Sequence, residues 1–145
     1  MASGLLLASG QVWVVDAIKD SINNISSGLY VGLMTNSTKP AEAAQLPTAA
    51  GITEIDELVD ASGYIRQLST TWAVTSGTDP YILGETVTFT ASGSWANVNG
   101  YFVSQTLAGT DAIWTELFSA SQAGARTSGD TILLTPKYEQ KDTNE

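Results

Sequence analysis

The spacing of apolar residues changes along the chain and predicts one helix followed by strands. Between Gln11 and Ile25 the apolar residues recur every three or four positions, as on one face of an amphipathic helix. After Gly63 they alternate with polar residues, as in the segment 86–91, and this period of two indicates half-buried antiparallel strands. We therefore expect a mainly β protein, an antiparallel β-sandwich of the jelly-roll kind, with an N-terminal α-helix at about residues 11–25.

The length of 145 residues fits one domain, which we expect to span residues 1–145. Residues 35–51 contain two prolines and keep neither period, which predicts a long loop, and loops of this length tend to bind partners. Residues 53–59 begin with a capping Thr and early acids, which favours a single helical turn. The polar residues 137–145 are expected to form an extended tail that is ordered by contacts outside the domain core.

The composition excludes several classes of function. The chain has no His and no Cys, so the usual proton shuttle and the usual zinc and copper ligands are missing. Its net charge is −9 with only six Lys and Arg, a field that repels nucleic acid. No apolar run approaches the length of a membrane span, and no nucleophile elbow or phosphate-binding loop is present. We expect a non-enzymatic protein with no cofactor, no metal, no nucleic acid and no membrane as partner.

The acidic and aromatic residues offer the candidate chemistry. Four acids between Glu54 and Asp60 form the densest charge in the chain, but their spacing does not fit a calcium loop, and we interpret them as a solvated turn. Aromatic residues inside strand patterns are usually core. Trp72 and Trp95 lie nearer to strand ends and are the better candidates for stacking against a sugar.

The weak charge predicts association. Only 14% of the residues are charged, against roughly 25% in typical soluble domains, so much of the surface is neutral. Neutral Thr-, Ser- and Ala-rich surface favours burial against other subunits.

Glycines, aromatic residues and strand-forming residues recur in five segments spread over nearly the whole chain, 29–36, 63–67, 98–103, 113–118 and 129–138. Together these segments resemble small virion structural proteins of tailed bacteriophages, which decorate or cement capsids or belong to tail fibres. The resemblance implies a capsid cement or decoration protein that binds the major capsid protein and stabilises the head. It also implies a homo-oligomer, most simply a trimer, that is made in the cytoplasm of the host bacterium and located on the capsid surface of the virion.

We expect the long loop and the tail to contact the partner. The candidate partner-binding residues are Lys39, Pro40, Pro47, Lys137, Tyr138 and Lys141. The alternative function is a tail-fibre adhesin or carbohydrate-binding module, with Trp72 and Trp95 as the glycan-binding residues.

Overall fold

The computed structural model describes residues 8–23, 28–38, 55–58, 61–76, 80–108 and 112–139, with the backbone alone for residues 8–13. Within these residues the chain is mainly β with one helix, α1 (Ala8–Asn23), which confirms the predicted fold class. The strands are β1 (Leu29–Met34), β2 (Gln67–Ser69), β3 (Trp72–Thr75), β4 (Tyr81–Gly84), β5 (Val87–Thr90), β6 (Trp95–Val98), β7 (Gly100–Ser104), β8 (Ala112–Leu117), β9 (Gly124–Arg126), β10 (Thr131–Leu134) and β11 (Lys137–Glu139).

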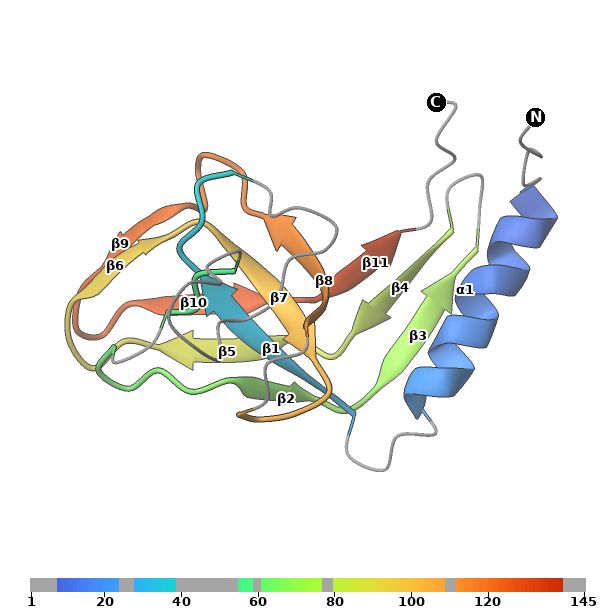
Figure 1. Ribbon diagram of the computed structural model, residues 1–145, viewed down its shortest axis with the longest axis horizontal. Coiled ribbons are helices and arrows are strands. Elements are labelled where there is room, and N and C mark those ends of the chain that lie inside the picture. Colours follow the sequence, from blue (N-terminus) through green and yellow to red (C-terminus); the bar gives the residue numbers. More distant parts are fainter. Residues whose placement is uncertain are drawn as a thin grey trace.

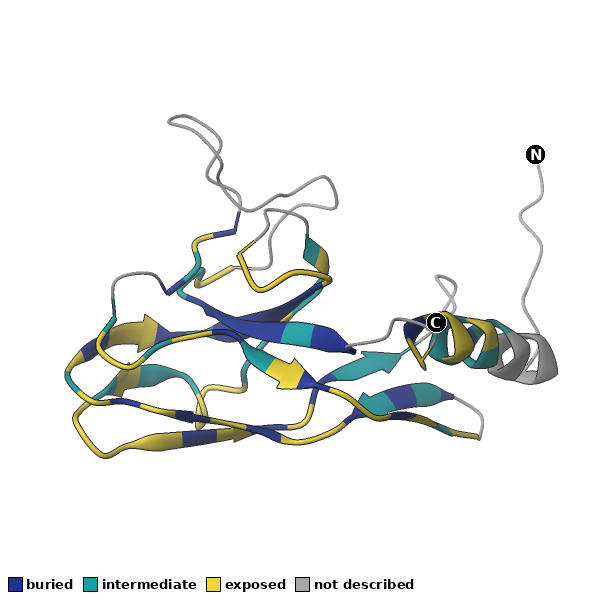
Figure 2. Ribbon diagram, turned by 90° about the horizontal axis from the view of Figure 1, so that it is seen from below, coloured by how far each residue is buried: buried dark blue, intermediate teal, exposed yellow. Residues whose placement is uncertain are grey.

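The strands form two layers, which are seen edge-on in Figure 2. One layer is the antiparallel sheet β2-β1-β7-β8. The other is a bent ribbon in which β4 and β5 follow one another along the chain and pair with β11 and β10, while β3 pairs with β4. The short pair β6-β9 lies at the end of the molecule farthest from α1 (Figure 1). Paired antiparallel layers agree with the predicted sandwich, whereas its jelly-roll connectivity stays a prediction.

The core lies between these layers and takes side chains from both. Val31 of β1 and Phe89 of β5 belong to one buried cluster. Strand β5 keeps the predicted alternation, with Val87 and Phe89 buried and Thr88 and Thr90 exposed. Burial of every second residue is therefore what fixes the orientation of this strand.

Helix α1 packs on β3 and β4, beside which it lies in Figure 1. Val15 is fully buried and Ile22 is 5% exposed, while Ile18 packs against the same core. This confirms the predicted apolar face. The helix begins at Ala8, ahead of the predicted start at about residue 11, and it is described as far as Asn23; the predicted end at about residue 25 lies outside the described residues. The amide of Asn23 donates to the backbone oxygen of Trp72 at 3.3 Å, which ties the end of α1 to β3.

Two local predictions differ from the structure. Residues 55–58 do not form a helical turn: Glu57 forms an antiparallel bridge with Met34, because this places Ile55 and Leu58 in the core. The predicted tail begins with a strand, since residues 137–139 pair with β4 and so are ordered by their own chain. Residues 39–54 and 140–145 lie outside the described residues.

Candidate functional site

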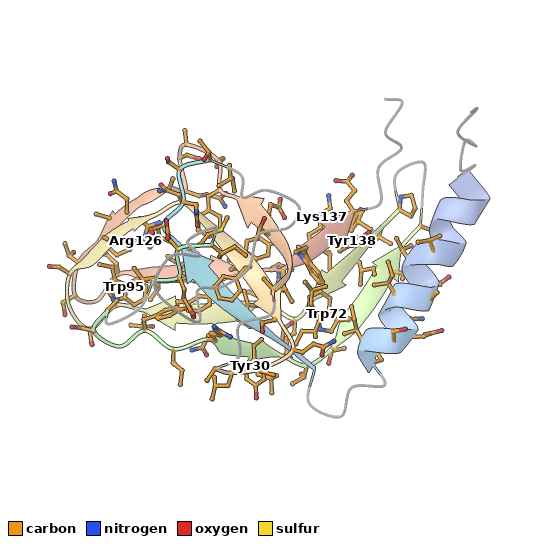
Figure 3. The ribbon with its side chains drawn as sticks, viewed as in Figure 1. Tyr30, Trp72, Trp95, Arg126, Lys137 and Tyr138 are labelled. Atoms are coloured by element: carbon orange, nitrogen blue, oxygen red, sulfur yellow. The ribbon has the colours of Figure 1, made fainter. Side chains whose placement is uncertain are left out.

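Both tryptophans proposed for sugar stacking lie in the core. Trp72 and Trp95 are each 3% exposed, and Figure 3 shows them in different parts of the domain. The indole N–H of Trp72 donates to the oxygen of Ser69 at 3.0 Å, and that of Trp95 donates to the oxygen of Ser62 at 2.8 Å. With their faces covered and their donors satisfied, neither ring offers a platform to a sugar.

The candidate partner-binding residues do not form a described cluster. Lys39, Pro40, Pro47 and Lys141 lie outside the described residues. Lys137 and Tyr138 are neighbours on β11 (Figure 3), and their side chains point to opposite faces of the strand, as successive strand residues do.

Lys137 and Tyr138 consequently have different surroundings. Tyr138 is half-buried, with its ring centroid 5.5 Å from that of Trp114. The ammonium of Lys137 lies 4.4 Å from the ring centroid of Tyr81 and 3.4 Å from the Glu139 carboxylate. Tyr138 therefore packs against the core, whereas Lys137, also half-buried, is held by polar and aromatic neighbours on its own side of the strand.

The predicted solvated acidic turn is correct for Asp56, which is exposed, but not for Glu57, whose side chain belongs to a largely buried ionic cluster. Glu54 and Asp60 lie outside the described residues. The guanidinium of Arg66 binds both carboxylate oxygens of Glu57, at 2.8 and 2.7 Å, and donates to the oxygen of Thr106 at 2.9 Å. The Tyr64 hydroxyl donates to Glu57 at 2.8 Å and accepts from the N–H of Leu33 at 3.0 Å. The side chains of Arg66 and Glu57 are only 6% and 12% exposed. The cluster thus links residues 55–58 to the four-stranded sheet.

The pKa shifts in this cluster favour its present protonation. Burial raises the pKa of Tyr64, and the neighbouring charge of Glu57 raises it further, so the phenol keeps its proton and donates. Burial alone lowers the pKa of Arg66, but the hydrogen bond and charge of Glu57 outweigh that effect and raise it. With every group committed to a neighbour, the arrangement suits anchoring rather than proton transfer.

Hydrogen bonds join residues 33–35 to residues 56–58, on the two sides of the undescribed residues 39–54. The N–H of Thr35 donates to the oxygen of Asp56 at 2.8 Å, and the N–H of Leu58 donates to the oxygen of Leu33 at 2.9 Å. The amide of Asn99 donates to the oxygen of Thr35 at 2.7 Å. The two chain ends on either side of residues 39–54 are therefore held together by the same sheet.

Large apolar side chains are exposed on the outer strands of the described sheets. Leu68 of β2 is 37% exposed, Ile113 of β8 is 47% exposed and Leu133 of β10 is 68% exposed. Strands β2 and β8 are the two edges of the four-stranded sheet. Ile113 and Trp114 also line a groove of about 550 Å³ between β8 and α1, together with Ile18 and Ile22.

The sequence reasoning missed the ionic cluster and the exposed edges. The signal for the cluster was the alternation after Gly63, which places Tyr64 and Arg66 on one face. That face is turned inward, while Ile65 on the other face is 54% exposed. An exposed Ile beside a buried Arg is the reverse of what hydropathy predicts, and the ion pair of Arg66 with Glu57 accounts for the burial of the Arg.

The known proteins offer no guide to these sites. Comparison with protein-family models, curated proteins and solved structures finds no significant match to this chain. Among the described residues, no group of three or more Asp or Glu side chains is placed to hold a metal ion. No described helix has the length and apolarity to cross a membrane.

Proposed function

We propose that the protein is a non-enzymatic structural component of a bacteriophage virion, a cement or decoration protein that forms homo-oligomers and binds the major capsid protein. Its resemblance to small phage virion proteins supports the virion role. One structural observation carries the assembly role: both edges of the sheet β2-β1-β7-β8 expose a large apolar side chain, Leu68 at one edge and Ile113 at the other.

Exposed apolar edges favour association. A free edge presents unpaired N–H and C=O groups, which monomeric proteins commonly protect with Lys, Pro or bulges. The segment of β8 is Ala-Ile-Trp-Thr-Glu-Leu, with a single charged residue, Glu116. Strand β2 is Gln-Leu-Ser and has none. Strand edges of this composition suit pairing with another chain more than contact with water.

The two edges also suggest a symmetry. A contact between β2 of one copy and β8 of the next joins different surfaces of the two molecules, and such a contact closes into a ring when the rotation between copies allows it. A trimer is the smallest ring of this kind.

The oligomeric state tests the assembly role. We expect light scattering of the purified full chain at micromolar concentration to give the mass of a closed oligomer. Ile113→Lys adds a charge to the β8 edge and should shift the mass to that of a monomer. Ala96→Lys is the matched control, because Ala96 is exposed on β6 at the other end of the domain. A wild-type monomer, or equal masses for the two variants, would remove the edges from the proposal.

A further inference from the structure

A second cavity, separate from the groove beside α1, lies where the two layers meet. Its volume is about 380 Å³, within the usual range of roughly 300–1,000 Å³ for small-molecule sites. Side chains from β7, β8 and β9 line it, together with the β10-β11 segment. The lining residues that matter here are Tyr101, Glu116, Phe118, Gln122 and Arg126.

A buried tyrosine fixes an acceptor in this cleft. Tyr101 is 4% exposed, and its hydroxyl donates to Glu116 Oε2 at 2.6 Å while accepting from the N–H of Lys137 at 2.9 Å. Burial raises the pKa of Tyr101, and its hydrogen bond to Glu116 raises it further, so this donor stays protonated at neutral pH. The exposed carboxylate of Glu116 is thus held in place and keeps lone pairs for a ligand.

A donor group is fixed on the neighbouring strand. Nη1 of Arg126 donates to the oxygens of Gly124 and Ala125, both at 3.0 Å, and Nη2 donates to the oxygen of Gln122 at 2.6 Å. A guanidinium has five N–H donors, so these three bonds orient it and leave donors for a ligand. Figure 3 shows Arg126 on β9 apart from Lys137 on β11, and both residues line the cleft.

Part of the remaining wall is apolar, although threonines also line the cleft. The ring of Phe118 is half-buried and lies 6.2 Å from that of Tyr101 between centroids, at a tilt of 35°. Leu83 adds a half-buried aliphatic side chain. An apolar wall beside fixed acceptors and donors matches a molecule that has an apolar face and hydroxyl groups at its rim.

The local charges identify the ligand class further. Glu116 and Arg126 in the cleft carry opposite charges, and the cation of Lys137 is compensated by Glu139 at 3.4 Å. Because the charges of Glu116 and Arg126 balance one another, the cleft itself has no excess charge that selects an anion or a cation over a neutral molecule. We infer that the cleft binds a small neutral carbohydrate of about one or two sugar units, whose hydroxyls donate to Glu116 and accept from Arg126. This binding does not depend on the proposed virion role.

The experiment is a titration of the full chain, followed by ¹H-¹⁵N NMR. The probes are neutral mono- and disaccharides, with sialic acid and glucosamine as charged probes. We expect at least one neutral sugar to give saturable shifts at the amides of Glu116, Phe118 and Arg126. A panel in which no neutral sugar binds, or in which only a charged probe binds, overturns the inference.

Variants then locate the site. Glu116→Gln keeps an acceptor for Tyr101 but loses the charge, and Phe118→Ala removes the apolar wall; each should weaken binding at least tenfold. Glu85→Gln is the matched control, because Glu85 is an exposed carboxylate that binds Thr70 outside the cleft. Equal affinity in wild type and Glu116→Gln, or shifts centred elsewhere, would also overturn the assignment. Circular dichroism of each variant establishes that it is folded.

Discussion

Replacement of Glu57 by Gln should destabilise the protein far more than an ordinary surface substitution. The Glu57 and Arg66 side chains are 12% and 6% exposed, and the shortest distance between guanidinium and carboxylate is 2.7 Å. Removing one partner of a buried ion pair leaves the other charge uncompensated, at a cost of about 3–5 kcal/mol. We expect the lower end of that range, about 3 kcal/mol, since Gln still accepts a hydrogen bond and Thr106 still binds Arg66.

A double-mutant cycle tests this reasoning. Arg66→Met keeps a flexible stem over the Phe102 ring, which lies 5.0 Å from the guanidinium carbon. The free energy of unfolding is measured by urea denaturation for each single variant and for the pair. The double variant should lose less than the sum of the singles, because neither charge is then left alone. Asp20→Asn, which breaks an exposed pair with Lys19, should leave the unfolding curve unchanged. Single effects below about 1 kcal/mol, or strict additivity, would refute a buried, coupled pair.

Two further predictions concern the helix and alkaline pH. Val15→Asp should prevent folding, as measured by circular dichroism. An unpaired charge at this fully buried position costs several kcal/mol, out of a free energy of unfolding of about 5–15 kcal/mol for a typical domain. Ala17→Asp, on the exposed side of α1, should fold, and equal spectra for the two variants would place α1 outside the core. The free energy of unfolding, measured in urea, should fall above about pH 10, because the unfolded chain loses tyrosine protons there while Tyr64 and Tyr101 keep theirs in the folded chain. Tyr101→Phe should make this decline shallower, and an unchanged decline would contradict the raised pKa of Tyr101.

The parts of the fold that depend on local spacing could be predicted from the sequence. The recurrence of Val15, Ile18 and Ile22 fixes which side of α1 meets the sheet, and the alternation of β5 fixes which side chains enter the core. These patterns work because a single period determines burial along the whole element. Helix α1 begins earlier than predicted because the spacing of apolar residues does not define where the helical hydrogen bonds start.

The candidate sites depend on residues that are distant in sequence, and here the prediction was weaker. Arg66 is buried only because Glu57 compensates its charge, and nothing in the spacing of the two residues announces the pair. In the sequence, residues 137–139 look like part of a polar tail, because the strand pairing with β4 that orders them leaves no local pattern. Trp72 and Trp95 lie near strand ends in the sequence, but the fold buries both, Trp72 against Trp114 and Trp95 against Tyr64.

The most direct test of the proposed function is whether the protein co-purifies with intact phage particles produced from the genome that encodes it. We expect washed particles to contain the wild-type chain at a fixed ratio to the major capsid protein, and to contain much less of Ile113→Lys than of Ala96→Lys. Particles that lack the wild-type chain after washing, or carry it at a ratio that varies between preparations, would contradict the account.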